Sequence, residues 1–121
     1  MVVMRAKDLL GRNGEVLAAG FLENQGMRIV DRNWRCTDGE IDIVALEGDT
    51  LVVAEVKTRR SLDYGHPFEA VGAAKLARLQ RLASAWCRAH ELDVPLRRID
   101  VVSVIDNGIG DPELEHLRGV G

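Results

Sequence analysis

Three ionisable residues stand inside otherwise apolar segments, at a spacing that suits phosphodiester chemistry. Asp42 lies in a run of isoleucine and valine, and Glu55 and Lys57 lie in a second such run. Magnesium is usually held in proteins by one or two carboxylates, with water and phosphate oxygens as its other ligands. A lysine beside the ion can orient a water or stabilise charge on a phosphate. These residues therefore predict a metal-dependent phosphodiesterase site.

The spacing of the two runs predicts a hairpin that brings these residues together. Residues 47–50, Glu-Gly-Asp-Thr, form a glycine-containing connection between them. If the turn is centred in that segment, paired residues have numbers that sum to 97. Asp42 then opposes Glu55, and Glu40 opposes Lys57. Directly opposed residues share a face, with β-carbons about 4.5–5.5 Å apart.

Two opposed carboxylates destabilise a strand pair unless something compensates their repulsion. A divalent cation would do so, and replacement of Asp42 or Glu55 by its neutral amide would then not harm folding. The alternative is two ordinary ion pairs, Glu40 with Lys57 and Asp42 with an arginine. Both interpretations remain open from the pattern alone.

The remaining periodicity predicts an α/β fold that positions this hairpin. Residues 51–57 are apolar on both faces, which is typical of a central strand. Helical spacing of Leu10, Leu17 and Phe21 predicts a first helix, with Gly26 just past its end. The expected order is α-β-β-β-α-β, a mixed sheet flanked by helices. Its elements are a helix at 7–25, strands at 27–35, 40–46 and 51–57, a helix from Pro67 to about His90, and a strand at 98–105.

Composition limits the class of protein. A chain of 121 residues suits a single domain, with a core at about 7–105 and a C-terminal tail at 106–121. It has no apolar run long enough for a membrane span and no signal-peptide pattern at its N-terminus. Two separated cysteines predict neither a disulfide framework nor a zinc site. We therefore expect a cytoplasmic protein without a membrane partner.

Charge is distributed unevenly along the chain. The net charge is −3, yet residues 57–90 carry seven basic and two acidic side chains. Attraction to a polyanion is local, because salt screens charges beyond about 10 Å at 0.1 M. Candidate phosphate contacts, which would position a duplex without reading its sequence, are Arg59, Arg60, Lys75, Arg78 and Arg81. A solvated basic helix face is the alternative.

Four further sets of residues bear on structure or function. Glu15 has Ala18, Ala19 and Leu22 as helix neighbours, and a glutamate on such an apolar flank marks either a functional site or a helix border. Asp100 is predicted to pair with an arginine and to be structural. The two tryptophans, Trp34 and Trp86, are assigned to the core. The three histidines are scattered, which disfavours zinc or histidine general-base chemistry.

In combination, these motifs resemble the YraN-like family of small bacterial proteins. The resemblance covers about residues 11–117. It rests on Gly14-Glu15, Arg32-Asn33 with Arg35, Gly39-Glu40-Ile41-Asp42-Ile43, Ala54-Glu55-Val56-Lys57-Thr58-Arg59, Ala70-Val71 with Lys75, and Arg98-Ile99-Asp100-Val101-Val102. That family is similar in fold to archaeal Holliday-junction resolvases and to restriction-endonuclease-like nucleases. The resemblance implies a site composed of Glu15, Asp42, Glu55 and Lys57.

Together, the spacing and the resemblance predict a Mg²⁺- or Mn²⁺-dependent endonuclease acting on DNA, with branched DNA as the implied substrate. Asp42, Glu55 and the backbone carbonyl of Val56 would hold the metal. Glu15 would complete the ligand shell, and Lys57 would help to activate the attacking water. One alternative is a non-catalytic nucleic-acid-binding module of the same fold, and another is an accessory protein that binds a partner. A homodimer is left open.

Overall fold

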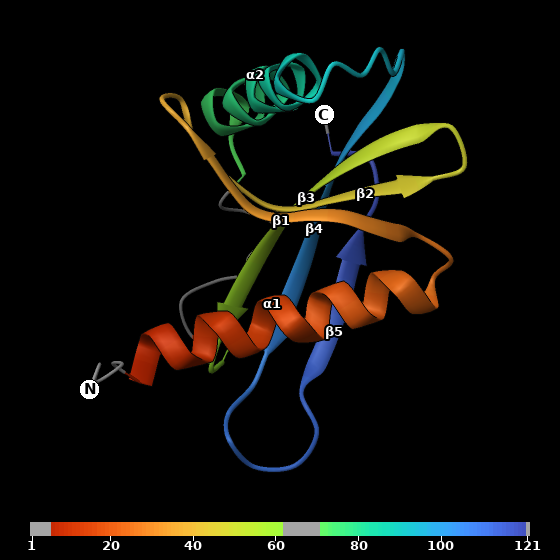
Figure 1. The fold of residues 1–121 in the computed structure, drawn as a ribbon. Coiled ribbons are helices and arrows are strands. Elements are labelled where there is room, and N and C mark those ends of the chain that lie inside the picture. The colour runs from red at the N-terminus through yellow and green to blue at the C-terminus, as the bar shows by residue number, and fades with distance from the viewer. Residues whose placement is uncertain (1–5, 62–70, 121) are drawn as a thin grey trace, which may run out of the picture.

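In the computed structural model, which describes residues 6–61 and 71–120, a five-stranded sheet lies between two helices (Figure 1). The elements are α1 (Ala6–Asn24), β1 (Arg28–Cys36), β2 (Gly39–Glu47), β3 (Thr50–Arg59), α2 (Ala73–Ala89), β4 (Leu96–Ile105) and β5 (Glu113–Leu117). The predicted α-β-β-β-α-β order is confirmed, with β5 as an addition. None of the described helices is long and apolar enough to cross a membrane.

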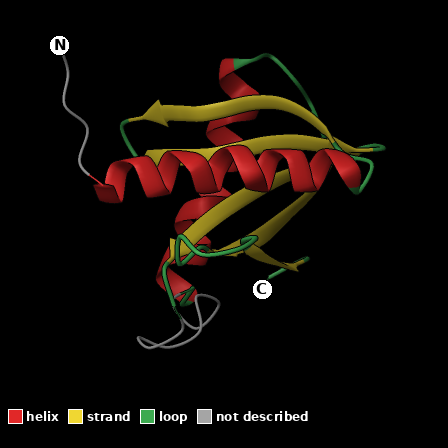
Figure 2. Ribbon diagram, turned by 90° about the horizontal axis from the view of Figure 1, so that it is seen from below, coloured by secondary structure: helices red, strands yellow, loops and turns green. Residues whose placement is uncertain are grey.

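The sheet is mixed, and β3 is its central strand, as its two apolar faces predict. The spatial order is β1-β2-β3-β4-β5. The β3–β4 pair is parallel, and the other three pairs are antiparallel. Parallel neighbours need a long crossover connection, and the chain from β3 to β4 contains α2. Figure 2 shows α1 in front of the sheet and α2 behind it.

Each helix covers its own face of the sheet with a separate apolar cluster. Alternate strand residues point to opposite faces, so β3 contributes to both clusters. The α1 cluster contains Ala18, Leu22, Ile43, Ala45, Val52, Ala54, Val102 and Val104. The α2 cluster contains Ile41, Val44, Leu51, Val53, Leu79, Leu82, Trp86 and Ile99. Trp86 is therefore a core residue as predicted, and Trp34 packs half-buried against the same cluster.

The β2–β3 hairpin has the predicted register, and it opens at the predicted site. Five cross-strand pairs, from Glu47–Thr50 to Ile43–Ala54, have residue numbers that sum to 97. The ladder of pairs ends there, one residue before Asp42. Ile41 and Ile43, two residues apart, belong to opposite core clusters. The regular alternation of β2 is therefore broken at Asp42, where the two strands part.

The C-terminal segment differs from the prediction. The sequence predicts a tail over residues 106–121, whereas β5 pairs antiparallel with β4 from Val101–Leu117 to Ile105–Glu113. Its Glu-Leu-Glu-His-Leu sequence alternates in burial as a half-covered strand does. The described part of the second helix begins at Ala73. Pro67 and the side chain of Leu10 lie outside the described residues.

Candidate functional site

Asp42 occupies the gap where β2 and β3 separate. Its Oδ2 accepts a hydrogen bond from the backbone N–H of Val56, with an N···O distance of 2.8 Å. The N–H and C=O of one strand residue point toward the same neighbouring strand. The carbonyl oxygen of Val56 is therefore directed toward the gap that holds the Asp42 carboxylate. This arrangement brings together two of the predicted metal-binding groups.

Asp42 and Glu55 line one cleft, of about 220 Å³, between the sheet and the first turns of α2. They therefore share a site, although the ladder of pairs that was predicted to place them directly opposite one another ends at Ile43–Ala54. The lining residues are Gly39, Glu40, Asp42, Glu55, Lys75, Arg78, Leu79 and Leu82. Two larger hollows, of about 400 and 290 Å³, border later turns of α2 and contain none of the four predicted site residues.

The Asp42 carboxyl has a strongly perturbed acidity. Burial, followed by the negative charge of Glu55, raises its pKa from 3.8 to about 7. Glu15 and Glu40 add to this effect, and the hydrogen bond from Val56 opposes it. No ion pair joins Asp42 to a cation among the side chains of residues 13–61 and 71–120. Asp42 is thus a half-buried carboxyl close to three other carboxylates, a position that a cation would stabilise.

Glu55, by contrast, has two cationic partners. Its Oε1 lies 3.1 Å from Nζ of Lys57 and 2.9 Å from Nζ of Lys75. The Glu55 side chain is only 11 % exposed, and both lysine side chains are about one-quarter exposed. Lys57 thus contacts the glutamate that stands two residues before it on β3. Lys75, a predicted phosphate contact, is a second partner of the same carboxylate oxygen.

The two lysines influence one another through Glu55. Burial, together with the neighbouring Lys75 ammonium, lowers the pKa of Lys57. The pKa of Lys75 lies above its ordinary value although burial opposes the increase, because Lys75 donates to Glu55. Lys57 is therefore the more readily deprotonated of the two, which suits a group that contacts an attacking water.

Glu40 does not pair with Lys57. The strands have separated before these positions, and Glu40 lies opposite Arg35 of β1, 3.4 Å from its Nε. The alternative of an ion pair between Glu40 and Lys57 is therefore wrong, and none of the arginine side chains that the structure describes pairs with Asp42. The contacts of Glu55 with Lys57 and Lys75 also change the expected effect on folding of a neutral amide at position 55. Glu55→Gln should destabilise the fold by leaving them uncompensated, whereas the expectation for a neutral amide at Asp42 is unchanged.

Helix α1 brings Glu15 within electrostatic range of Asp42, since its charge contributes to the raised pKa of Asp42. Gly14 allows the helix to lie this close to β3. A β-carbon on Gly14 would be 2.0 Å from Oγ1 and 2.9 Å from Cγ2 of Thr58. The absence of a side chain at Gly14 therefore allows α1 to pack closely against the sheet.

Gly14→Ala should lower the free energy of unfolding by about 1–3 kcal/mol, because the added methyl group overpacks the contact with Thr58. Gly20→Ala is the matched control in the same helix, since its β-carbon would meet nothing within 4 Å. That control should gain up to about 1 kcal/mol from helix propensity. Denaturant melts measure both. The double variant Gly14→Ala/Thr58→Ala should recover most of the loss, and equal melts for the two alanine variants would contradict the close approach.

The predicted nucleic-acid contacts are only partly gathered at the cleft. Arg78 lines it, one helical turn after Lys75, and is exposed. Arg81 and Arg60 are exposed but do not line it. Arg59 ends β3, and its buried Nε has no hydrogen-bond partner among the described residues.

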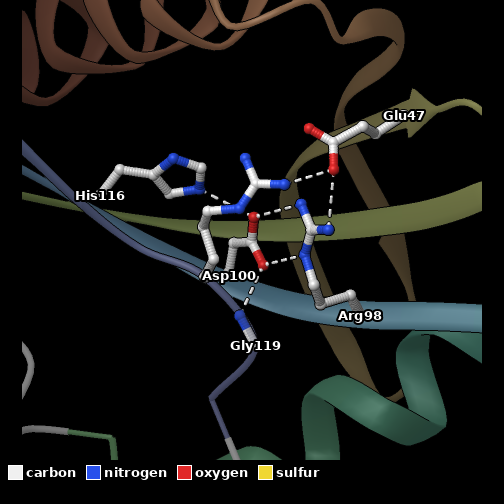
Figure 3. Close-up of polar contacts among 6 residues, drawn as sticks. Glu47, Arg98, Asp100, His116 and Gly119 are labelled. Carbon is white, nitrogen blue, oxygen red and sulfur yellow. Dashed lines mark hydrogen bonds and ion pairs between the residues drawn. The ribbon is translucent and has the colours of Figure 1, made fainter.

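Asp100 belongs to a separate buried network on β4, which confirms its structural role (Figure 3). Arg98 donates to both carboxylate oxygens at 2.8 and 3.1 Å, and the backbone N–H of Gly119 donates at 2.9 Å. Nε2 of His116 lies 2.7 Å from Oδ2. Arg98 also binds Glu47 at 2.9 Å. This network joins β4 to β5 and to the chain after it. Sequence reasoning missed His116, for which the alternation of β5 is the only signal.

Among the described residues at the cleft, the groups suited to binding a metal are oxygen donors. Asp42, Glu55 and the Val56 carbonyl suit a hard divalent cation such as magnesium. Within the described ranges, no group of three or more histidine, cysteine, aspartate or glutamate side chains is arranged to hold an ion. An ion at this position would therefore take Asp42, Glu55 and the Val56 carbonyl, and Glu15, water and substrate would fill its remaining positions.

Comparison with known proteins places the whole chain in one family. The model of "Uncharacterised protein family UPF0102" matches residues 14–104, a range that spans Glu15, Asp42, Glu55 and Lys57. A UPF0102 protein of Paenarthrobacter aurescens is 83% identical over 120 residues, with 99% of each chain covered. One from Renibacterium salmoninarum is 58% identical, covering 98% of this chain and 100% of its own. One from Streptomyces griseus is 52% identical, with 97% and 99% covered. The chain belongs to the UPF0102 family of YraN-like proteins.

Proposed function

We propose that this protein is a magnesium- or manganese-dependent endonuclease that hydrolyses phosphodiester bonds of DNA in the cytoplasm. The observation that carries the proposal is the position of Asp42. Its carboxyl lies in the gap between β2 and β3, hydrogen-bonded to Val56 and surrounded by other carboxylates, with a pKa of about 7. Perturbed carboxyls in a cleft are candidates for functional groups, and a divalent cation would relieve this repulsion.

The residues present fit such an ion. Asp42, Glu55 and the Val56 carbonyl would hold it, and Glu15 would complete the shell directly or through water. When bound, the metal supplies Lewis-acid stabilisation of charge on the phosphate. Lys57, 3.1 Å from Glu55, would donate hydrogen bonds that orient the attacking water and stabilise charge on the phosphate.

Positive charge on α2 suits a DNA substrate. Arg78 is exposed at the cleft, and Arg81 lies one turn further along the helix. Contacts of this kind bind phosphates without reading bases. A nuclease that uses them would select DNA by shape, which agrees with the branched substrates that the family resemblance implies.

The test is cleavage of branched and linear DNA with added Mg²⁺ or Mn²⁺ by the wild type and by Asp42→Asn. Wild type should cleave, with branched DNA preferred. Asp42→Asn should lose at least about a hundredfold in rate, the order that one electrostatic catalytic contact contributes. It should remain folded, because an amide oxygen can still accept the hydrogen bond from Val56. Asp42→Asn is preferable to Glu55→Gln, which also removes the partner of two lysines.

Asp38→Asn is the matched control, since Asp38 is an exposed turn residue with the same charge. It should cleave like the wild type. Equal cleavage by wild type and Asp42→Asn would remove Asp42 from the catalytic site. Salt-dependent DNA binding without cleavage in either metal would instead support the non-catalytic nucleic-acid-binding module.

A further inference from the structure

Glu55 presents a single carboxylate oxygen to two ammonium groups from different elements. Lys57 comes from the same strand, two residues along, and Lys75 comes from α2. Both contact Oε1, at 3.1 and 2.9 Å. A carboxylate oxygen has two lone-pair sites, so the two lysines together use the hydrogen-bonding capacity of Oε1.

Lys75 stands at an unfavourable place on its own helix. It is the third residue of α2, whose N-cap, Gly72, provides no side-chain hydrogen bond and whose first turn has no acidic residue. A cation near a helix N-terminus is repelled by the helix dipole, and Arg78 repels it from the next turn. The contact with Glu55 offsets both effects. The position of the Lys75 ammonium group thus depends on the negative charge of one carboxylate.

A metal at the proposed site would compete for that charge. Magnesium binds carboxylate oxygens at about 2.0–2.1 Å, so an ion on Oε1 would come into direct repulsion with an ammonium 2.9 Å from the same oxygen. Lys57 is held close to Glu55 by the backbone of β3. Lys75 reaches Glu55 from α2 and lines the cleft together with Arg78. Lys75 is therefore the lysine that can leave Glu55 and contact another group in the cleft.

We propose that Lys75 is an internal counter-ion that occupies Glu55 in the metal-free protein, is displaced when a divalent cation binds, and then contacts a substrate phosphate beside Arg78. The inference rests on the proposed function and deepens it. Metal loading frees a positive charge at the cleft, so the metal and the polyanionic substrate bind cooperatively. Lys75 thus neutralises and positions the Glu55 carboxylate before the metal binds, and it contacts a substrate phosphate afterwards.

The test is calorimetric titration of the DNA-free protein with Mn²⁺, for wild type, Lys75→Met and Arg88→Met. Lys75→Met keeps the side-chain length and removes the competing charge. It should bind Mn²⁺ about tenfold more tightly than wild type, within the usual range for coupling between two sites. Arg88→Met removes the same charge from the last turn of the same helix, outside the cleft, and should bind Mn²⁺ as the wild type does.

A second measurement uses the wild type alone and does not depend on the folding of a variant. In NMR spectra of the lysine ammonium groups, added Mg²⁺ should shift the Lys75 signal and shorten its lifetime, while Lys57 keeps its contact with Glu55. Unchanged or weaker Mn²⁺ binding by Lys75→Met, or a Lys75 signal unaffected by saturating Mg²⁺, would overturn the exchange and leave the metal site standing. Absence of Mn²⁺ binding in the wild type would overturn the proposed function itself, and the exchange with it.

Discussion

The metal-free protein is expected to lose stability between about pH 4 and pH 7 through Asp42. Its pKa is 3.8 in the unfolded chain and about 7 in the folded one. Between these values the folded state retains a proton that the unfolded state has released, so raising the pH favours unfolding. The contribution is fully present below pH 3.8 and is lost as the pH rises through 7. Each pH unit inside this window corresponds to up to about 1.4 kcal/mol.

Thermal melts from pH 5 to pH 8 without metal, comparing wild type with Asp42→Asn, isolate this effect from other titrations. The melting temperature of Asp42→Asn relative to wild type should rise from pH 5 to about pH 7 and level off above it. Asp38→Asn, an exposed turn variant of equal charge change, should follow the wild type. Saturating magnesium should flatten the wild-type curve, because the ion binds the ionised carboxylate of the native state. Parallel curves for wild type and Asp42→Asn would mean that Asp42 does not titrate near neutrality.

Asp100→Ala should destabilise the fold more than Gly14→Ala does, with a loss of about 3–5 kcal/mol. The carboxylate is fully buried and receives Arg98, His116 and the backbone of Gly119. Its removal leaves the partly buried guanidinium of Arg98 with Glu47 as its remaining partner. It also leaves the backbone N–H of Gly119 without its acceptor. Because the network holds β5 to β4 (Figure 3), the C-terminal segment should also become sensitive to protease.

Asp111→Ala is the control, since Asp111 is exposed in the connection between β4 and β5. It should change the free energy of unfolding by less than about 0.5 kcal/mol.

The stability that Asp100 contributes changes with pH in the opposite direction to that of Asp42. Burial raises the pKa of Asp100, but bonds from Arg98, Gly119 and His116 outweigh it, so the pKa lies below the ordinary value. Its stabilisation is present above pH 3.8 and is lost on acidification through the folded pKa. Urea melts at pH 7 in which Asp100→Ala matches the control would contradict the structural role.

The hairpin could be predicted from the sequence because its determinants are local. A two-residue turn with Gly48, whose φ is +58°, sets the register, and strand periodicity then determines which residues face one another. Five pairs follow that rule. Asp42 departs from it, because β1, β3 and both helices together decide where β2 stops pairing with β3. Local periodicity carries no information about that boundary.

The basic residues of α2 show the limit of the same reasoning. Helical spacing places Lys75, Arg78 and Arg81 on related positions of one helix, but it does not say what lies opposite each of them. The docking of α2 is set by burial of Leu79, Leu82 and Trp86 against the sheet. That packing directs Lys75 to Glu55 and leaves Arg81 in solvent.

The sequence by itself determined the fold class, the central strand, the hairpin register, and Asp42 and Glu55 as neighbours. Each follows from hydrophobic periodicity or turn chemistry, which depend on a few neighbouring residues. The tertiary structure alone decided that Lys75 shares Glu55 with Lys57, that Gly14 admits α1 against Thr58, and that His116 reaches Asp100. Except for Lys57 with Glu55, these contacts join residues that stand far apart in the chain. They depend on how layers pack around the core, a property of the whole molecule that no local pattern encodes.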